Sequence, residues 1–136
     1  DAEFSDLAGR ADCVLVDAPC SGSGAWRRSP DARWRLTPEL LESYRATQRE
    51  VLARGAALVR PGGRLVYVTC SLLPSENEDQ VAGFLASHPD FTALPWADFW
   101  PENLPRPLAA EGAALRLSPA STGTDGFFIA VMERRR

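Results

Sequence analysis

Apolar positions follow two different periods along this chain, and their order predicts an α/β arrangement. Residues 13–17, CVLVD, form a short apolar run that is typical of a buried strand. Apolar residues then recur at helical spacing after Thr37, a favourable N-cap, and Pro38, which suits the first helical position. Residues 61–63, PGG, end that helix, and residues 64–70, RLVYVTC, predict a strand that is covered on both faces.

The second half of the chain predicts shorter elements. Ser75 and Glu78 have the spacing of a capping box, and a short amphipathic helix follows them and ends before Pro89. Residues 90–112 are rich in proline and glycine and predict irregular structure. Residues 115–117 and 127–132 predict two late strands, which pair as a terminal antiparallel hairpin.

The strand–helix–strand order brings two unusual loops together. A crossover helix places the strands that end at Asp17 and Cys70 parallel to each other, so both loops start at the same edge of the sheet. Ligands bind at the carboxyl edge in open α/β sheets. Residues 18–36 predict a long loop of Gly, Ser, Pro and Arg, a length that is usually functional or disordered. We therefore expect Cys20 and Cys70 to face one cleft.

Length and composition indicate part of a larger domain. The 136 residues suffice for one domain, and the 45% of hydrophobic residues can form a core. No apolar run approaches the roughly 20 residues of a membrane helix, so we expect no membrane association. A doubly wound sheet needs more strands, and no glycine-rich cofactor turn follows a strand here. The missing first half is therefore expected upstream of Asp1. Three cysteines without a CxxC pair argue against disulfides or zinc and favour a reducing cytoplasm.

The charge pattern changes this picture at one place. The net charge of −3 argues against a protein that coats nucleic acid. All fifteen basic residues are arginine, however, and four of them lie within nine residues: Arg27, Arg28, Arg33 and Arg35. Arginine suits bidentate contacts to phosphate. These four residues are candidates for RNA binding, and a solvated charged loop is an equally supported alternative.

The motifs DAPCSGSG at 17–24 and TCS at 69–71 resemble those of the Fmu/Sun-type RNA cytosine-5 methyltransferases. The segments RRSPDARW at 27–34, PGGRLVYVTCSLLPSENE at 61–78 and GTDGFF at 123–128 are similar to that family in look and order. The resemblance implies the C-terminal part of a Rossmann-like S-adenosylmethionine-dependent methyltransferase fold, with residues 1–136 as a partial catalytic domain. It implies methylation of carbon 5 of cytosine in RNA, with ribosomal RNA favoured over transfer RNA.

The resemblance also implies roles for individual residues. Cys70 of the TC motif is the thiol that attacks the base, and Cys20 of the PC motif helps to resolve the covalent adduct. Asp17 holds the N3/N4 edge of the base and lies near the methionine end of S-adenosylmethionine. Asp1 marks the end of a cofactor-contacting segment. Asp125 is placed near the active cleft, where it joins the four arginines as a substrate-binding candidate.

Several alternatives stay open at this point. The related DNA enzymes attack with a Pro-Cys thiol, so Cys20 is the alternative nucleophile, although the presence of Thr69-Cys70 disfavours it. The chain is alternatively a non-catalytic fragment or an RNA-binding half that cannot hold the cofactor alone. A methyltransferase for DNA or a small molecule is a third, less favoured hypothesis. Cys13, in mid-strand, is interpreted as a small buried hydrophobe.

Overall fold

The structure is a computed structural model, which describes residues 2–107 and 112–136, with side chains from Phe4 onward. Its strands are β1 (Ala11–Asp17), β2 (Val59–Thr69), β3 (Phe91–Leu94), β4 (Leu115–Leu117) and β5 (Phe127–Arg134). Its α-helices are α1 (Pro30–Arg35), α2 (Pro38–Leu58), α3 (Glu78–Ser87) and α4 (Pro119–Thr122). Short 3₁₀ turns are η1 (Ala2–Leu7), η2 (Ser23–Ala25), η3 (Pro74–Glu76) and η4 (Trp96–Asp98). Among these described residues, no helix is both long and apolar enough to cross a membrane.

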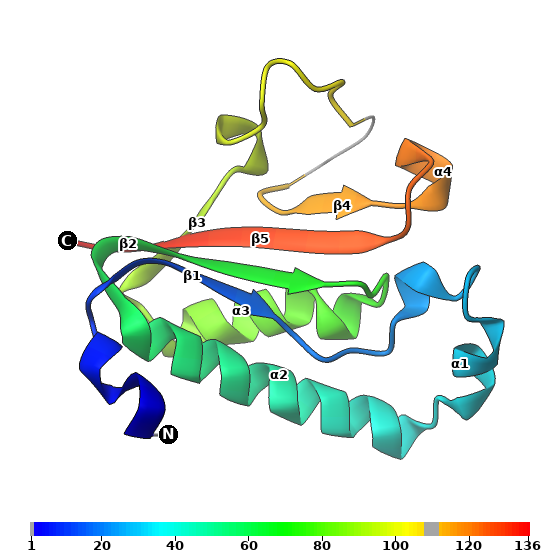
Figure 1. Cartoon of the computed structure of the whole chain (residues 1–136), viewed down its shortest axis with the longest axis horizontal. Helices are drawn as coiled ribbons and strands as arrows, with labels where there is room; N and C mark the ends of the chain where they lie inside the picture. The colour runs from blue at the N-terminus through cyan, green and yellow to red at the C-terminus, as the bar shows by residue number, and fades with distance from the viewer. Residues whose placement is uncertain (1, 108–111) are drawn as a thin grey trace.

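The strands form one mixed sheet in the order β1-β2-β5-β3, and β4 also pairs with β5 (Figure 1). β1 runs parallel to β2, with Val16 opposite Tyr67, as the crossover through α2 predicts. β5 is antiparallel to β2, β3 and β4. The predicted parallel pair, the predicted antiparallel pairing of the two late strands and the α/β class are confirmed. β5 nevertheless lies inside the sheet, because it pairs with β2 as well as with β4.

The long helix α2 begins where its sequence predicts. Pro38 is its first residue, and the Thr37 side chain accepts a hydrogen bond from the Leu40 N–H at 3.1 Å. The helix ends at Leu58, and β2 starts directly at Val59, ahead of the predicted start at residue 64. The PGG segment therefore lies within the strand. It is accommodated by an irregular register between β1 and β2.

The predicted capping box before α3 is wrong. Ser75 lies inside η3, and α3 begins at Glu78 after Asn77, whose side chain makes no capping hydrogen bond. The side chain of Glu76 is fully buried instead. The predicted end of this helix before Pro89 is confirmed, since α3 stops at Ser87.

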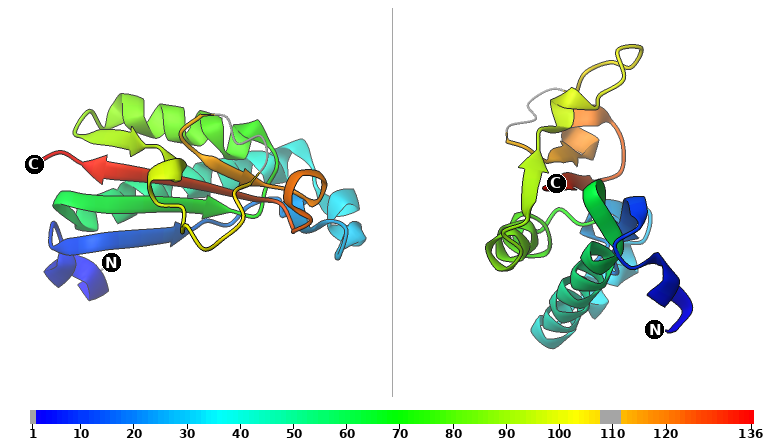
Figure 2. Two further views of the ribbon diagram at one scale, coloured as in Figure 1. Left: turned by 90° about the horizontal axis from the view of Figure 1, so that it is seen from above. Right: turned by 90° about the vertical axis from the view of Figure 1, so that its left-hand side faces the viewer.

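Helices α2 and α3 lie on the same face of the sheet, where the core forms (Figure 2). Leu52 of α2 and Phe84 of α3 are buried against this face. The strand residues of the core include Leu65, Tyr67, Phe128, Ala130 and Met132. Along β2, buried positions alternate with half-buried ones such as Val66 and Val68. The prediction that this strand is covered on both faces is therefore wrong for the described chain.

Four other local predictions are also wrong. β1 is largely exposed, because it is the outermost strand of the described sheet, and its Leu15 is 66% exposed. Cys13 is exposed for the same reason. The segment predicted as a loop over residues 18–36 contains η2 and α1. The segment predicted as irregular over 90–112 contains β3, whose Phe91 packs into the core through pairing with β5.

Candidate active site

The two cysteine loops meet at the carboxyl edge of β1 and β2. Asp17 ends β1 and Thr69 ends β2, and parallel pairing puts both ends on one side of the sheet. From there the chain continues to Cys20 and Cys70, whose Sγ atoms lie 3.4 Å apart, within hydrogen-bonding distance. Both thiols are free and half-buried. The structure thus brings the two predicted catalytic cysteines to a single site.

The two thiols differ in their acidity. The hydrogen bond from Cys20 lowers the pKa of Cys70 to about 7, although burial opposes it. The same hydrogen bond, together with burial, raises the pKa of Cys20 above its ordinary value. The negative charges of Asp17 and Glu76 are smaller influences that raise the pKa of Cys70. Near neutral pH, the pair therefore favours a thiolate on Cys70 and a donating thiol on Cys20.

Two glycines, Gly24 and Gly126, allow the segment before β5 to pack against the two cysteine loops. Gly24 donates its N–H to the Cys70 carbonyl at 2.9 Å, and Gly126 donates to the Gly24 carbonyl at 2.8 Å. A Cβ on Gly24 would lie 2.2 Å from the Gly126 carbonyl oxygen, so a side chain does not fit there. Ser23 adds a further link, because its Oγ accepts from the Leu72 N–H at 2.8 Å. The backbone before β5 is therefore tied to both cysteine loops.

A buried polar network, which the sequence analysis missed, also joins the two loops. At its centre is Glu76, which is 0% exposed and accepts hydrogen bonds from the N–H and Oγ of Ser21 at 2.9 and 2.6 Å. Ser71 also donates to it. The other members are Gln48, Tyr67, Thr69, Asn77 and Gln80. The sequence signal for this network was the acidic segment SENE at residues 75–78, shortly after TCS. Its interpretation as a capping box assigned no role to Glu76.

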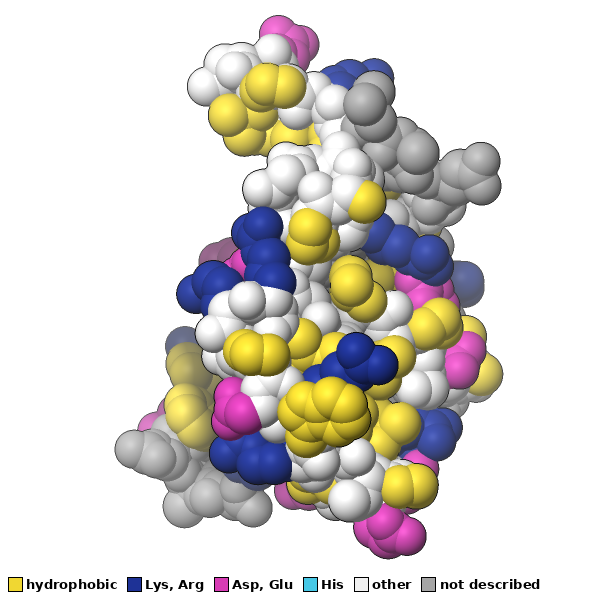
Figure 3. All heavy atoms as spheres, turned by 90° about the vertical axis from the view of Figure 1, so that its right-hand side faces the viewer, with side chains coloured by type: hydrophobic (Ala, Val, Ile, Leu, Met, Phe, Trp, Pro, Cys, Tyr) yellow, Lys and Arg dark blue, Asp and Glu magenta, His cyan; other side chains and the backbone are white. Residues whose placement is uncertain are grey.

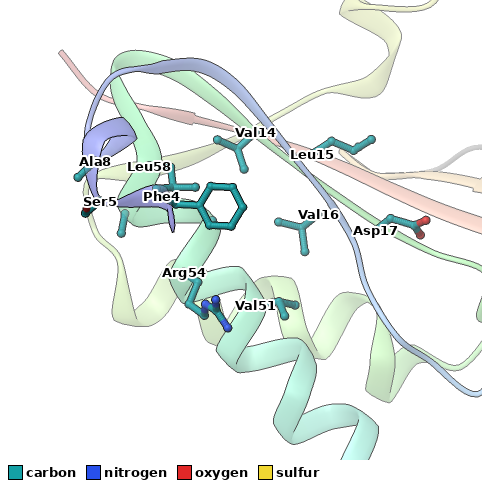
Figure 4. A pocket seen from close by; sticks show the side chains of 12 residues that line it. Phe4, Ser5, Ala8, Val14, Leu15, Val16, Asp17, Val51, Arg54 and Leu58 are labelled. Carbon is teal, nitrogen blue, oxygen red and sulfur yellow. The ribbon is translucent and has the colours of Figure 1, made fainter. Parts of the chain in front are cut away.

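Asp17, the third predicted catalytic residue, lies exposed at the end of β1. It borders a hollow of about 530 Å³ between η1, β1 and α2, whose other lining residues are mainly apolar (Figure 4). Phe4, Val14 and Leu58 are among them. The charge of Asp17 raises the pKa of Cys70, so this end of the hollow is close enough to the thiols to influence their ionisation. Asp1, the second predicted cofactor-binding residue, lies outside the described residues.

Two of the four candidate arginines pair with the candidate Asp125. Arg27 Nε and Arg28 Nη2 lie 2.8 and 2.5 Å from the two carboxylate oxygens of Asp125. The hydrogen bond from Arg27, followed by that from Arg28, lowers the pKa of Asp125. Three of the predicted substrate-binding residues therefore form one cluster beside Gly126.

The other two candidate arginines lie on α1. Arg35 pairs with Asp31 at 2.9 Å, and the guanidinium of Arg33 lies 5.5 Å from the ring centre of Trp34, which is 81% exposed. Figure 3 shows this end of the molecule, where arginine side chains alternate with carboxylates and exposed apolar groups. Arg35 also borders a hollow of about 350 Å³ that reaches Ser21, next to Cys20. Three of the four arginines, Arg27, Arg28 and Arg35, thus lie beside segments that adjoin the cysteine loops, in a region of mixed charge.

Comparison with known proteins decides the family. A family model described as "16S rRNA methyltransferase RsmB/F" matches residues 2–133, nearly the whole chain. This chain belongs to the RsmB/F methyltransferase family. The family predicted from the cysteine motifs is therefore confirmed, and so is the Rossmann-like α/β fold class.

Relatives of this RsmB/F chain are much longer than the chain itself. A Synechocystis sp. protein named "Probable ribosomal RNA small subunit methyltransferase B" is 39% identical over 123 residues, which are 90% of this chain and 27% of that protein. The crystal structure of PH0851 has a TM-score of 0.81 and 38% identity, and the match covers 93% of this chain and 27% of that one. NSun6 from Pyrococcus horikoshii, solved with SFG, has a TM-score of 0.70 and 27% identity over 90% of this chain and 29% of that one.

Proposed function

We propose that this chain is the catalytic part of an enzyme that methylates carbon 5 of cytosine in RNA through a covalent cysteine adduct. One observation carries the proposal: two free thiols, with Sγ atoms 3.4 Å apart, lie at the carboxyl edge of two parallel strands. Membership of the RsmB/F family and a relative named as a ribosomal RNA methyltransferase favour ribosomal over transfer RNA.

Cys70 is the attacking thiol in this proposal. Carbon 5 of cytosine is a poor nucleophile until the aromatic ring is broken. Addition of the Cys70 thiolate forms an Sγ–C6 bond and moves a ring electron pair toward carbon 5, which becomes enamine-like. A pKa of about 7 keeps a large share of Cys70 ionised at neutral pH. Cys20 is the weaker candidate, because its hydrogen bond to Cys70 and its burial raise its pKa.

Cys20 completes the reaction by helping to resolve the adduct. After methylation, carbon 5 must lose a proton while the Sγ–C6 bond breaks, which restores the aromatic ring and returns the Cys70 thiolate. The largest cause that raises the pKa of Cys20 is its hydrogen bond to Cys70. A carbon-bonded Cys70 sulfur is a weak acceptor, so this restraint on Cys20 is relieved in the adduct. Once Cys20 has released its own proton to solvent, its thiolate can accept the proton from carbon 5.

S-adenosylmethionine supplies the methyl group when it is bound. In this proposal, the carboxylate of Asp17 accepts a hydrogen bond from the amino group of the cofactor or holds the N3/N4 edge of the base. The adjacent hollow is open and mainly apolar, which fits one side of such a ligand. SFG, found with NSun6, is an S-adenosylmethionine analogue, which supports the same cofactor here.

The arginines near the site are proposed to bind RNA phosphates. Arg27 and Arg28 already pair with Asp125, so a phosphate has to compete with that carboxylate. Removing one arginine–phosphate interaction should reduce the slope of log affinity against log salt by roughly 0.7 to 0.9. We expect a full-length variant with all four arginines replaced by alanine to show a shallower slope. An unchanged slope would exclude these residues from phosphate binding.

The chain is further proposed to need the upstream part of its domain. It spans a little over a quarter of the relatives it matches, and Leu15 on the outer strand is 66% exposed. The alternative function, a non-catalytic fragment or RNA-binding half, shares the expectation that this chain cannot hold the cofactor by itself. Calorimetry tests that expectation: we expect weak or no S-adenosylmethionine binding by this chain and clear binding by the full-length protein. Tight binding by the chain alone would reject the need for the upstream part.

A reducing cytoplasm is the proposed location of this protein, because it suits the free thiols of the chain.

Two cysteine variants of the full-length protein test the chemistry. Cys70→Ala should lower methylation by roughly 10³-fold or more, because no sulfur is left to attack the base. Cys20→Ala should accumulate the protein–RNA adduct, visible as a slow band on a denaturing gel. Cys13→Ala is the matched control, since this exposed thiol lies in mid-strand, outside the site. Normal methylation by Cys70→Ala would refute the nucleophile assignment, and normal turnover without an adduct would refute the role of Cys20.

A further inference from the structure

Glu76 occupies an unusual position for a glutamate. It lies in η3, directly after the TCS loop, and is 0% exposed. Glutamate is almost never fully buried unless its carboxylate is paired. In the described part of the chain, its hydrogen-bond donors are neutral groups: the N–H and Oγ of Ser21, the Oγ of Ser71 and the amide of Gln48. A carboxylate held by so many donors serves as a fixed acceptor.

The donors come from both cysteine loops, and each loop serine directly follows a site thiol. Ser21 follows Cys20 and donates to both oxygens of Glu76, at 2.9 Å from its N–H and 2.6 Å from its Oγ. Ser71 follows Cys70 and donates to Oε2. The amide of Gln48 lies 3.2 Å from Oε1 and also donates to the carbonyl of Pro19 at 2.9 Å. Cys20 is therefore held through the residues on both of its sides.

We infer that Glu76 is a positioning residue that sets the separation of the Cys20 and Cys70 sulfur atoms by clamping the residue after each. Catalytic groups have to be held to within about 0.5 Å of their working geometry. Other contacts join the loops, notably the Gly24 N–H to Cys70 carbonyl bond and the 3.3 Å contact between the Oγ atoms of Ser21 and Ser71. The Glu76 carboxylate adds a charged acceptor that takes hydrogen bonds from both of these serines. The inference rests on the proposed function for its catalytic meaning, while the clamp itself is a property of this chain.

Charge and position make opposite predictions for the same substitution. The negative charge of Glu76 raises the pKa of Cys70, and the hydrogen bond from Cys20, the larger cause, lowers it. If Glu76 acted through its charge alone, removing that charge would make Cys70 more acidic. If it positions the thiols, its removal weakens the Cys20–Cys70 hydrogen bond and makes Cys70 less acidic. The direction of the change therefore separates the two roles.

The test measures the rate of Cys70 alkylation by iodoacetamide as a function of pH, in this chain with the background substitution Cys13→Ser. We expect the midpoint to rise from about 7 by at least roughly half a pH unit in Glu76→Gln. It should rise further in Glu76→Ala, which has no acceptor at all. Should the alanine variant fail to fold, the glutamine variant decides. A folded Glu76→Gln with an unchanged or lowered midpoint would overturn the inference.

Tyr67→Phe is the matched control, because it removes a buried hydrogen bond to Glu76 without touching the carboxylate. The Tyr67 hydroxyl donates to the backbone carbonyl of Glu76 at 2.6 Å. We expect a lower melting temperature and an unchanged alkylation midpoint. A raised midpoint in this control would assign the effect to general loosening of the fold, against a specific clamp. The assay needs neither RNA nor cofactor, so its result is independent of whether the full-length protein methylates cytosine.

Discussion

The carboxyl edge of the sheet and the outer edge of β1 belong to one sheet but differ in how far the rest of the chain covers and bonds them. At the carboxyl edge, backbone and side-chain hydrogen bonds tie the cysteine loops to each other and to the segment before β5. At the outer edge, Leu15 is 66% exposed beside a hollow of about 530 Å³. The comparison indicates that this chain builds the thiol site by itself and leaves open the edge of β1 where we propose that the cofactor binds.

The largest expected difference between the two regions is in core packing. Leu65 in β2 is 0% exposed, whereas Leu15 in β1 is 66% exposed. We expect Leu65→Ala to lower the free energy of unfolding by about 3 kcal/mol, because it leaves a cavity. Leu15→Ala should change it by less than about 0.5 kcal/mol. Urea unfolding of both variants measures the contrast, and a similar loss in each would show that the outer edge is packed after all.

A second contrast uses the same substitution at two glycines. Gly24→Ala places a methyl group against the Gly126 carbonyl, and we expect it to cost about 2 kcal/mol or more of unfolding free energy. Gly83 lies in α3, and a Cβ added there would point into open space, so Gly83→Ala should stabilise the protein by roughly 0.5 to 1 kcal/mol. If Gly24→Ala is as stable as the original chain, the close contact of the three loop segments does not persist in solution.

The smallest effect concerns the ion pairs around Asp125. Asp125→Asn should cause a minor loss of stability near neutral pH, because it removes partners of Arg27 and Arg28 at the surface. The pKa of Asp125 is lowered in the folded chain, so this contribution is present above the unfolded pKa. It is lost as the pH falls through the lowered folded value. Thermal melts at a series of pH values should show the variant and the original converge in acid, and a gap that widens in acid would contradict the pairing.

The sequence predicted the elements whose signals are local. Thr37 and Pro38 mark the start of α2, and the motifs around Cys20 and Cys70 predicted that the two thiols meet and identified the family. The alternation of β1 and β2 with a helix also predicted their parallel pairing. These features follow from neighbouring residues or from simple rules of connection, so a single chain suffices to infer them.

The features that the sequence did not predict depend on distant partners. β1 is exposed because the described sheet ends at that strand, which its apolar residues do not reveal. β3 is a strand because it pairs with β5, despite the prolines around it. Glu76 looked like part of a helix start, but donors 28 and 55 residues away make it a buried acceptor. Long-range hydrogen bonds override local preference in each case.

The most direct test of the account is the acidity of Cys70 with and without its neighbour. Cys70 alkylation would be followed from roughly pH 5 to 10 in Cys13→Ser and in the same chain with Cys20→Ala. The account predicts a midpoint of about 7 when Cys20 is present. Without Cys20, the midpoint should approach the ordinary value of about 8.5. The rate at pH 7 should then fall by only roughly threefold, because the higher intrinsic nucleophilicity of each remaining thiolate partly offsets the smaller thiolate fraction. Equal midpoints near 8.5 in both chains, or faster alkylation of Cys20 than of Cys70 at neutral pH, would contradict it.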